Sequence, residues 1–249
     1  MFLAFSGEPM FDSEIFTNLA LLILCYVYIL LIILISGKMD SVLHISRKSS
    51  RKFLHVMIGN LPLIIPFFSY TSFPLNFPFL VAAPFILVTF LASPYSPSKR
   101  VYEKMKGLSD ITEEGHQLGL VFYALSYTLL ALFFSDRPYV IAAGVLPMAY
   151  GDAFAALIGE KYGKRHYRVF AKKSLEGSIA MFLASFISFA VSLLFFSVLY
   201  SFPISEAMLA ALGVAFVAAL AESLSPLGFD NITVPILSAL AFLILSGGV

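Results

Sequence analysis

Charged residues are scarce in this sequence. They make up 12% of the 249 residues, about half of the share that a soluble globular domain carries. The net charge is only +1, so there is no basic excess that would indicate a nucleic-acid partner. Cys25 is the one cysteine, which excludes an intramolecular disulfide and a thiolate metal cluster. Hydrophobic residues make up 59% and the mean hydropathy is +0.91, so the composition predicts a membrane protein.

The apolar residues are grouped into eight runs. A transmembrane helix needs about 20 apolar residues to cross a hydrocarbon core of roughly 30 Å. The runs are 15–35, 53–69, 77–92, 118–134, 139–159, 175–198, 205–222 and 232–245. The second and third are short and rich in proline, so a kinked or partly re-entrant course is open for them. No linker separates the runs, and residues 1–249 are therefore predicted to form one all-α, polytopic membrane helix bundle with about eight transmembrane helices.

The basic residues fall almost entirely on alternate loops. Fifteen of the 16 Lys and Arg residues lie in loops 37–52, 93–117 and 160–174, and Arg137 is the exception. By the positive-inside rule these three loops are cytoplasmic and both termini lie outside. The alternation requires an even number of spans, which supports eight.

Three of the later spans carry small residues four positions apart. Such spacing places each set on one helix face, and small faces let helix backbones approach closely in lipid. The fifth, sixth and seventh spans are therefore predicted to form a tight core. The sets are Gly151, Ala155, Gly159 and Gly163; Ala180, Ala184, Ser188 and Ser192; and Ala207, Ala211, Ala215 and Ala219.

Asp152 is the most informative single residue, because it lies within an apolar run, about 10 Å from the predicted cytoplasmic end. A carboxylate near the bilayer centre costs about 2.5–3.5 kcal/mol, which indicates a metal, a proton path or a substrate. A buried ion pair with a basic residue is the structural alternative. Glu222, Asp230 and Asn231 are expected at the same membrane face, and carboxylates with an amide oxygen suit Mg²⁺. Asp230 is equally typical of an ordinary helix N-cap.

The third basic loop has the features of a phosphate-binding segment. Gly159 and Gly163 allow backbone NH groups to approach an anion closely. Lys172 and Lys173 precede Ser174, a suitable N-cap for a helix whose N-terminus favours phosphate. The spacing is not that of a Walker A loop. A solvated basic loop that only fixes the topology is the alternative.

A second group of candidates opens the second span. Arg51 and Lys52 suit a polyphosphate, and His55, on the same helix face, suits positioning or deprotonating an alcohol. Two cations and a histidine at a cytoplasmic helix end are also common membrane anchors. Asn60 is a weaker candidate for a polar contact. The acidic segment 110–116 is expected to be mostly a solvated surface.

Taken in order, these motifs resemble the family of dolichol and phytol kinases, which are CTP-dependent polyprenol kinases. The matching segments are Arg-Lys-Phe-Leu-His at 51–55, Gly-Asp-Ala-Phe-Ala at 151–155, Lys-Lys-Ser-Leu-Glu-Gly at 172–177 and Asp-Asn-Ile-Thr-Val-Pro at 230–235. The related CDP-diglyceride synthases usually close with His-Gly-Gly and then Asp-Arg-x-Asp. This chain has Pro-Leu-Gly-Phe-Asp-Asn at 226–231 instead, which favours the kinases.

The resemblance implies CTP as the phosphoryl donor and Mg²⁺ as the cofactor. The residues alone indicate a polyphosphate, a divalent metal and a membrane-resident acceptor. The predicted catalytic residues are Asp152, His55 and Lys173, with the choice of base between Asp152 and His55 left open. The predicted phosphate-binding residues are Arg51, Lys52, Gly159, Gly163, Lys164, Lys172, Lys173, Ser174 and Glu176. The predicted metal ligands are Asp152, Glu222, Asp230 and Asn231.

The predicted function is therefore a CTP-dependent kinase that phosphorylates a dolichol-like or phytol-like isoprenoid alcohol at the cytoplasmic face. One alternative is a phosphatidate cytidylyltransferase, which would release pyrophosphate rather than CDP. Another is a proton- or cation-coupled transporter, whose acidic residues should be spread through the depth of the membrane. The expected partners are CTP, the lipid alcohol and the bilayer, with no nucleic acid; a homodimer and the chain length of the alcohol are left open.

Overall fold

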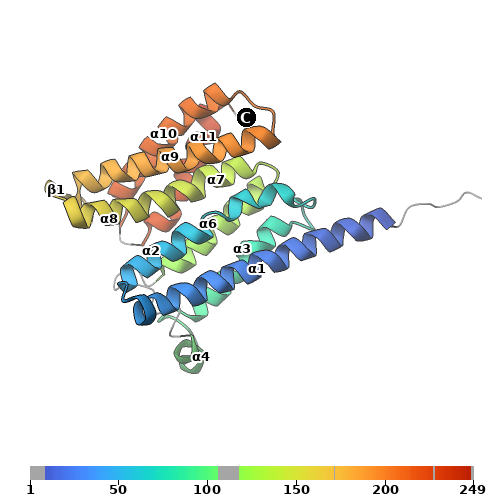
Figure 1. The fold of residues 1–249 in the computed structure, drawn as a ribbon, viewed down its shortest axis with the longest axis horizontal. Coiled ribbons are helices and arrows are strands. Elements are labelled where there is room, and N and C mark those ends of the chain that lie inside the picture. Colours follow the sequence, from blue (N-terminus) through green and yellow to red (C-terminus); the bar gives the residue numbers. More distant parts are fainter. Residues whose placement is uncertain (1–8, 106–117, 171, 227, 248–249) are drawn as a thin grey trace, which may run out of the picture.

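The computed structural model describes residues 9–105, 118–170, 172–226 and 228–247. Over these ranges the chain forms a bundle of helices with a short two-stranded hairpin at one end (Figure 1). The segment 110–116 lies outside the described residues. The helices are α1 (Pro9–Leu43), α2 (Arg47–Ile58), α3 (Phe77–Leu91), α4 (Lys99–Lys104), α6 (Gly119–Phe134), α7 (Pro138–Leu146), α8 (Asp152–Tyr162), α9 (Leu175–Leu199), α10 (Ile204–Leu224) and α11 (Asp230–Leu245).

Most of the predicted spans are present as apolar helices. Within the described ranges, four helical stretches are long and apolar enough to cross a membrane: Ser13–Met39, Pro138–Tyr162, Leu175–Leu199 and Ile204–Leu224. Helices α3, α6 and α11 are apolar but shorter. The helical architecture is therefore confirmed. The hairpin of β1 (His166–Arg168) and β2 (Lys172–Ser174) was not predicted and lies within the third basic loop.

The second predicted span, 53–69, is wrong as a continuous helix. Helix α2 ends at Ile58, and two 3₁₀ turns follow, η1 (Leu61–Leu63) and η2 (Ile65–Phe67). Each turn carries a proline, Pro62 or Pro66, at its start. Because proline has no backbone NH and its ring crowds the carbonyl four residues before it, each of these prolines disfavours continuation of the α-helix. The run therefore enters the bundle as a short helix followed by tight turns.

Helices α8 and α9 approach each other as closely as the glycine spacing predicts. A Cβ added to Gly151 would lie 2.5 Å from Met181 Sδ, and one added to Gly177 would lie 3.0 Å from the carbonyl oxygen of Ala155. Gly159 and Gly177 also face one another, since a Cβ on Gly177 would lie 3.3 Å from Gly159 Cα. These glycines are required by helix packing, which in lipid depends on close van der Waals contact.

The other two small-residue faces have different environments. Ala207, Ala211 and Ala215 of α10 are fully buried, so this face packs as predicted. Helix α9 packs on α8 and α10, as predicted for a tight core, but its small face lines an apolar groove. The four α9 residues in that groove are Ala180, Ala184, Ser188 and Ser192.

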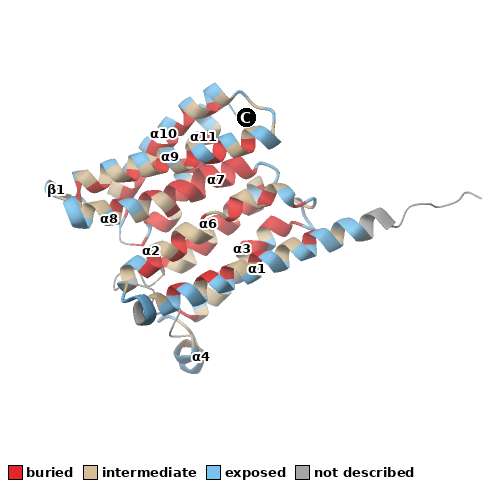
Figure 2. Cartoon of the chain, in the orientation of Figure 1, coloured by how far each residue is buried: buried red, intermediate tan, exposed pale blue. Residues whose placement is uncertain are grey.

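Helix α7 is the centre of the core. All nine of its residues are buried, and it is surrounded by α6, α9 and α11 (Figure 2). It continues without interruption into a π-helical turn, η3 (Pro147–Gly151), and then into α8. A helix that is apolar on every side is typical of a bundle interior. The core therefore fixes the position at which α8 begins, and the first residue of α8 is Asp152.

Substitution of Gly144 tests this packing. We expect Gly144→Ala to lower the stability by about 1–3 kcal/mol, because overpacking a filled core forces backbone shifts. The added Cβ would lie 2.6 Å from both Leu130 Cδ1 and the carbonyl oxygen of Pro235. The matched control is Gly37→Ala, whose Cβ would meet nothing within 4 Å. Thermal unfolding in detergent should separate the two variants, and equal midpoints would contradict the described packing.

Candidate active site

A polar cavity of about 580 Å³ lies at the end of the bundle that carries the hairpin. Its wall is built from α2, α8, β1, β2 and α9, the end of α10 and the start of α11. Ten of the predicted site residues line it: Arg51, Lys52, Asp152, Gly159, Gly163, Lys172, Lys173, Ser174, Glu222 and Asp230. Residues that are up to 180 positions apart in the sequence therefore share one cavity.

Asp152 is held in this cavity by an ion pair with Lys52 of α2. Both side chains are largely buried, with exposed fractions of 16% and 13%. Asp152 follows the π-helical turn η3, and such turns are frequent at functional sites. The ion pair that was the structural alternative for Asp152 is therefore present. It balances the carboxylate without excluding a role toward a substrate, since the pair lines an open cavity.

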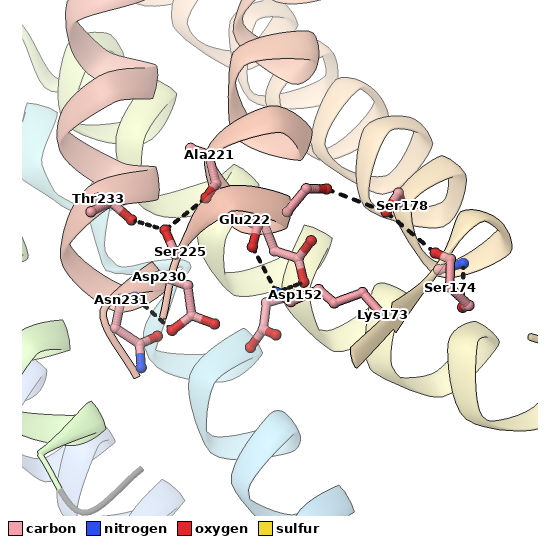
Figure 3. Close-up of polar contacts among 12 residues, drawn as sticks. Asp152, Lys173, Ser174, Ser178, Ala221, Glu222, Ser225, Asp230, Asn231 and Thr233 are labelled. Atoms are coloured by element: carbon pink, nitrogen blue, oxygen red, sulfur yellow. Dashed lines mark hydrogen bonds and ion pairs between the residues drawn. The ribbon is translucent and has the colours of Figure 1, made fainter. Parts of the chain in front are cut away.

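Lys173 and Glu222 form a second ion pair across the cavity (Figure 3). Lys173 extends from β2, and its Nζ also donates a hydrogen bond of 2.7 Å to the backbone carbonyl of Glu222. Glu222 is the more buried partner, with 8% of its side chain exposed. The lysine therefore both neutralises the carboxylate and satisfies a carbonyl at the end of α10.

Asp230 completes the acidic part of the cavity. It is 9% exposed and interacts electrostatically with Asp152, Glu222, Lys52 and Lys173. Figure 3 shows the carboxylates of Asp152, Glu222 and Asp230 gathered around one space. The acidic residues of α8, α10 and α11 thus converge on the lysine-bearing hairpin. Three carboxylates beside Lys52, Lys173 and the buried Arg51 leave the site with mixed charge.

Asn231 bears on the predicted metal site. It is 5% exposed, and within the described chain no hydrogen-bond donor reaches its Oδ1. A buried amide oxygen without a donor is rare and requires a reason, and a bound cation supplies one. Its own backbone NH donates to Asp230 Oδ1 at 3.0 Å. The amide oxygen and the neighbouring carboxylate are hard oxygen donors, which fit Mg²⁺.

The protein residues alone do not form a closed metal cage. Among the residues described, no group of three His, Cys, Asp or Glu side chains is arranged to hold a metal ion. Mg²⁺ usually takes only one or two carboxylates from the protein and its other ligands from phosphate and water. The donor set therefore fits an ion that arrives with a polyphosphate rather than a permanent structural metal.

The hairpin is fastened to the helices by a hydroxyl cluster. Tyr167 lies opposite Lys173 in the β1–β2 pairing. Its hydroxyl is 2.5 Å from Ser178 Oγ of α9 and 2.7 Å from Ser223 Oγ of α10. One tyrosine therefore ties the strand pair to both helices and fixes the register of the strand that carries Lys173.

The backbone NH groups predicted to cradle phosphate already have partners. Glu176 accepts hydrogen bonds from the backbone NH groups of Lys164 and Arg165 at 3.1 and 3.3 Å. The NH of Gly163 donates to the carbonyl of Gly159, and that of Gly177 to Ser174 Oγ. Lys164 and Glu176 are not among the residues that line the cavity. Their predicted contact with phosphate does not match this placement, and Glu176 holds the hairpin in position instead.

His55 is not on the cavity wall either. It is 4% exposed, its ring packs on Tyr123 with centroids 4.8 Å apart, and its carbonyl accepts a hydrogen bond from the Tyr123 hydroxyl at 3.2 Å. It does contribute to the electrostatic environment of Asp152. His55 is therefore buried inside the protein and does not face the cavity that Asp152 and Lys52 line.

Sequence reasoning missed one further contact. Lys48 of α2 forms an ion pair with Glu160 of α8 at the rim of the cavity. A signal for it exists in the sequence, since Lys48 lies four residues before Lys52 and Glu160 lies eight residues after Asp152. These spacings put two cations on one face of α2 and two carboxylates on one face of α8. The two helices are therefore joined by two ion pairs in succession.

The stability of the central ion pair is testable by a double-mutant cycle. We expect Lys173→Met to destabilise the protein more than Lys173→Met combined with Glu222→Gln, because the single variant leaves a buried carboxylate without its lysine. The coupling energy should be about 0.5–3 kcal/mol, measured by thermal unfolding in detergent.

The control cycle is Lys48→Met with Glu160→Gln, whose side chains are 36% and 57% exposed. Exposed pairs are worth about 0–1 kcal/mol, so this cycle should show a smaller coupling. A coupling near zero at Lys173 and Glu222 would contradict the described burial.

The apolar helices and the charged cavity at one end of the bundle define the class: a membrane-embedded helical protein with a polar cavity of mixed charge. Among known proteins, the chain is 43% identical over 128 residues to a phytol kinase from Synechocystis; that match covers 50% of this chain and 53% of the relative, about half of its length. It is 33% identical over 209 residues to a probable chloroplastic phytol kinase 2 of Glycine max, covering 81% of this chain and 67% of the relative. The chain belongs to the phytol kinase family.

A third relative is named for a different lipid. The chain is 29% identical over 209 residues to a CTP-dependent diacylglycerol kinase 1 of Eremothecium gossypii, covering 76% of this chain and 64% of the relative. No family model and no solved structure matches the chain. The resemblance to the dolichol and phytol kinases that the motifs predicted is confirmed by these relatives.

Proposed function

We propose that this protein is a CTP-dependent kinase that phosphorylates an isoprenoid alcohol of the membrane, giving the lipid monophosphate and CDP. The observation that carries the proposal is the single cavity in which lysines of α2 and β2 meet carboxylates of α8, α10 and α11. Phosphoryl transfer depends mainly on positioning and charge neutralisation, and the cavity has groups for both. The names of the relatives support the acceptor and the donor.

The lysines carry the binding of the triphosphate. Lys52 and Lys173 are paired with carboxylates in the structure, and Lys172 is an exposed cation on the same wall. An incoming triphosphate offers both paired lysines a second anionic partner, which weakens their hold on Asp152 and Glu222. Binding of the nucleotide therefore prepares the carboxylates for the second substrate.

Asp152 is the group that accepts the proton of the alcohol. The alcohol oxygen forms a bond to the γ-phosphorus, the bond from that phosphorus to the β,γ-bridging oxygen breaks, and the hydroxyl proton moves to the Asp152 carboxylate. A positioned carboxylate of this kind contributes typically about 10²–10⁴-fold. We choose Asp152 over His55 as the base because it lines the cavity, whereas His55 is packed behind it.

Three of the predicted metal ligands, Asp152, Glu222 and Asp230, line the cavity, and Asn231 follows Asp230 directly in the chain. Glu222, Asp230 and Asn231 would hold Mg²⁺, with Asp152 beside them. A bound Mg²⁺ supplies charge neutralisation to the phosphate oxygens. Without it, Asp230 has no lysine of its own among the ion pairs described, while Lys52 and Lys173 are each engaged by another carboxylate.

Eight membrane crossings, with both termini outside, fit the helices and the charge pattern. The shorter crossings are α3, α6, α11 and the segment from α2 to η2. Because the cavity is built at the ends of helices that join the basic loops, the positive-inside rule puts it at the cytoplasmic face. CTP would then enter from the cytoplasm.

The activity is tested by supplying CTP, Mg²⁺ and isoprenoid alcohols to the purified protein in detergent. We expect a lipid monophosphate and CDP, and a fall of about 100-fold or more in Asp152→Asn, since the carboxylate no longer accepts the proton. The matched control is Asp136→Asn, an exposed carboxylate next to Arg137, which should retain activity. Release of pyrophosphate in place of CDP would identify a cytidylyltransferase, and full activity of Asp152→Asn would remove this residue from the mechanism.

The topology is tested by labelling two introduced cysteines in intact cells with a membrane-impermeant maleimide. Val169 lies at the hairpin and Ser201 follows α9, and both are exposed. We expect Ser201→Cys to react in intact cells and Val169→Cys only after permeabilisation. The native Cys25 is 1% exposed and gives little background. Reaction of Val169→Cys in intact cells would place the cavity outside.

A further inference from the structure

A second cavity, of about 610 Å³, lies on the opposite face of α8 from the polar site. Its walls are α7, α8, α9 and the turn that follows α2, and its lining is almost entirely apolar. Phe154 and Ile158 of α8 face it, whereas Asp152 and Ala156 face the polar cavity. The size is within the range of about 300–1,000 Å³ that ligand pockets have.

The groove begins at the depth of the polar cavity and continues along the membrane-spanning part of α9. Its α9 lining extends from Ala180 to Phe195, which is about 22 Å at 1.5 Å per residue. That length is most of a hydrocarbon core of roughly 30 Å. Ala180 lies six residues after Ser174, a residue of the polar cavity. The groove is therefore long enough for a lipid chain, and one of its ends lies at the same depth as the polar cavity.

The groove exists for two reasons: helix α2 ends before it reaches this side of α8, and α9 presents only small side chains as the floor. Helix α2 ends at Ile58, so only the turn at Asn60 and Leu63 reaches this side of α8. On α9 a single row of small side chains forms the floor, from Ala180 and Ala184 to Ser192. Larger residues that border the row are open to lipid: Leu183, Ile187 and Val191 are 50%, 59% and 61% exposed.

A polar pair lies at one edge of this apolar lining. The hydroxyl of Tyr150 donates a hydrogen bond of 2.8 Å to Asn60 Oδ1, and Asn60 Nδ2 donates to the carbonyl of Val56 at 3.0 Å. Tyr150 is only two residues before Asp152. Its hydroxyl oxygen can still accept a hydrogen bond, for example from an alcohol. A few polar groups in an apolar pocket usually fix the orientation of the ligand.

We propose that this groove binds the hydrocarbon chain of the isoprenoid alcohol, with the tail along α9 and the hydroxyl leaving the groove at the end that is level with the polar cavity, where Asp152 lies. The proposal rests on the proposed function. The floor is one row of small residues, which fits one methyl-branched chain rather than the two chains of a diacylglycerol. Because the groove is open to the lipid phase, the alcohol enters from the side without passing through water.

Ala184→Phe places an aromatic ring on the floor of the groove. We expect kcat/KM for a 20-carbon isoprenoid alcohol to fall about tenfold or more, since the loss of even one methylene from an apolar pocket costs roughly 10–200-fold. The KM for CTP should stay within about twofold of the unsubstituted protein, because the polar cavity is not changed. The control is Leu194→Phe, which introduces the same ring on a lipid-exposed face of α9 outside the groove.

A binding measurement separates this proposal from the proposed function. A 20-carbon isoprenoid alcohol bearing a diazirine should label the stretches 146–158 and 180–195, and Ala184→Phe should remove that labelling whether or not the protein turns over CTP. Labelling elsewhere, or unchanged labelling in Ala184→Phe, would show that the hydrocarbon chain does not bind in the groove. Equal competition by diacylglycerol overturns the single-chain occupant. Labelling of the groove without any phosphorylation would contradict the proposed function and leave the lipid site in place.

Discussion

The need to balance charge inside a membrane decides how this bundle is built. Asp152 and Glu222 lie at or near the ends of apolar helices, and each is paired with a lysine from another element. Because an unpaired buried charge is strongly destabilising, the two pairs require α2, β2, α8 and α10 to meet at one place. The charges that hold the helix ends together are the same charges that a triphosphate and a divalent cation would engage. Structural stability and the proposed chemistry therefore depend on one set of side chains.

Much of the architecture could be predicted from local features of the sequence. The apolar runs, the alternation of basic loops and the glycines of α8 each depend on physics that acts within a few residues. The course after α2 could not be predicted from hydropathy, because 53–69 is predominantly apolar, while the helix stops ahead of Pro62 and Pro66. The hairpin could not be predicted either, since strands of three residues are too short to show an alternating pattern in the sequence.

The site was predictable in its composition but less so in its contacts. Asp152 stood out because a carboxylate in an apolar run is costly, and Lys172, Lys173, Glu222 and Asp230 followed from topology. Which lysine pairs with which carboxylate depends on tertiary packing and could not be read from spacing. Glu176 shows the limit most clearly, because a motif residue next to two lysines is used to hold backbone NH groups.

The π-helical turn between α7 and α8 has a consequence for tolerance to insertion and deletion. A π turn accommodates an additional residue within a continuous helix, and each residue of an α-helix corresponds to about 100° of rotation. Removing one residue from Pro147–Gly151 would return this stretch to regular α geometry with α8 in its present orientation, whereas removing one residue from the regular helix α7 would rotate α8 by about that angle relative to the residues that precede the deletion. The carboxylate of Asp152 would then turn away from Lys52, and the polar and apolar cavities would no longer lie on their present faces of α8. The direction in which Asp152 faces is thus set by a change of helical phase within the backbone that precedes it.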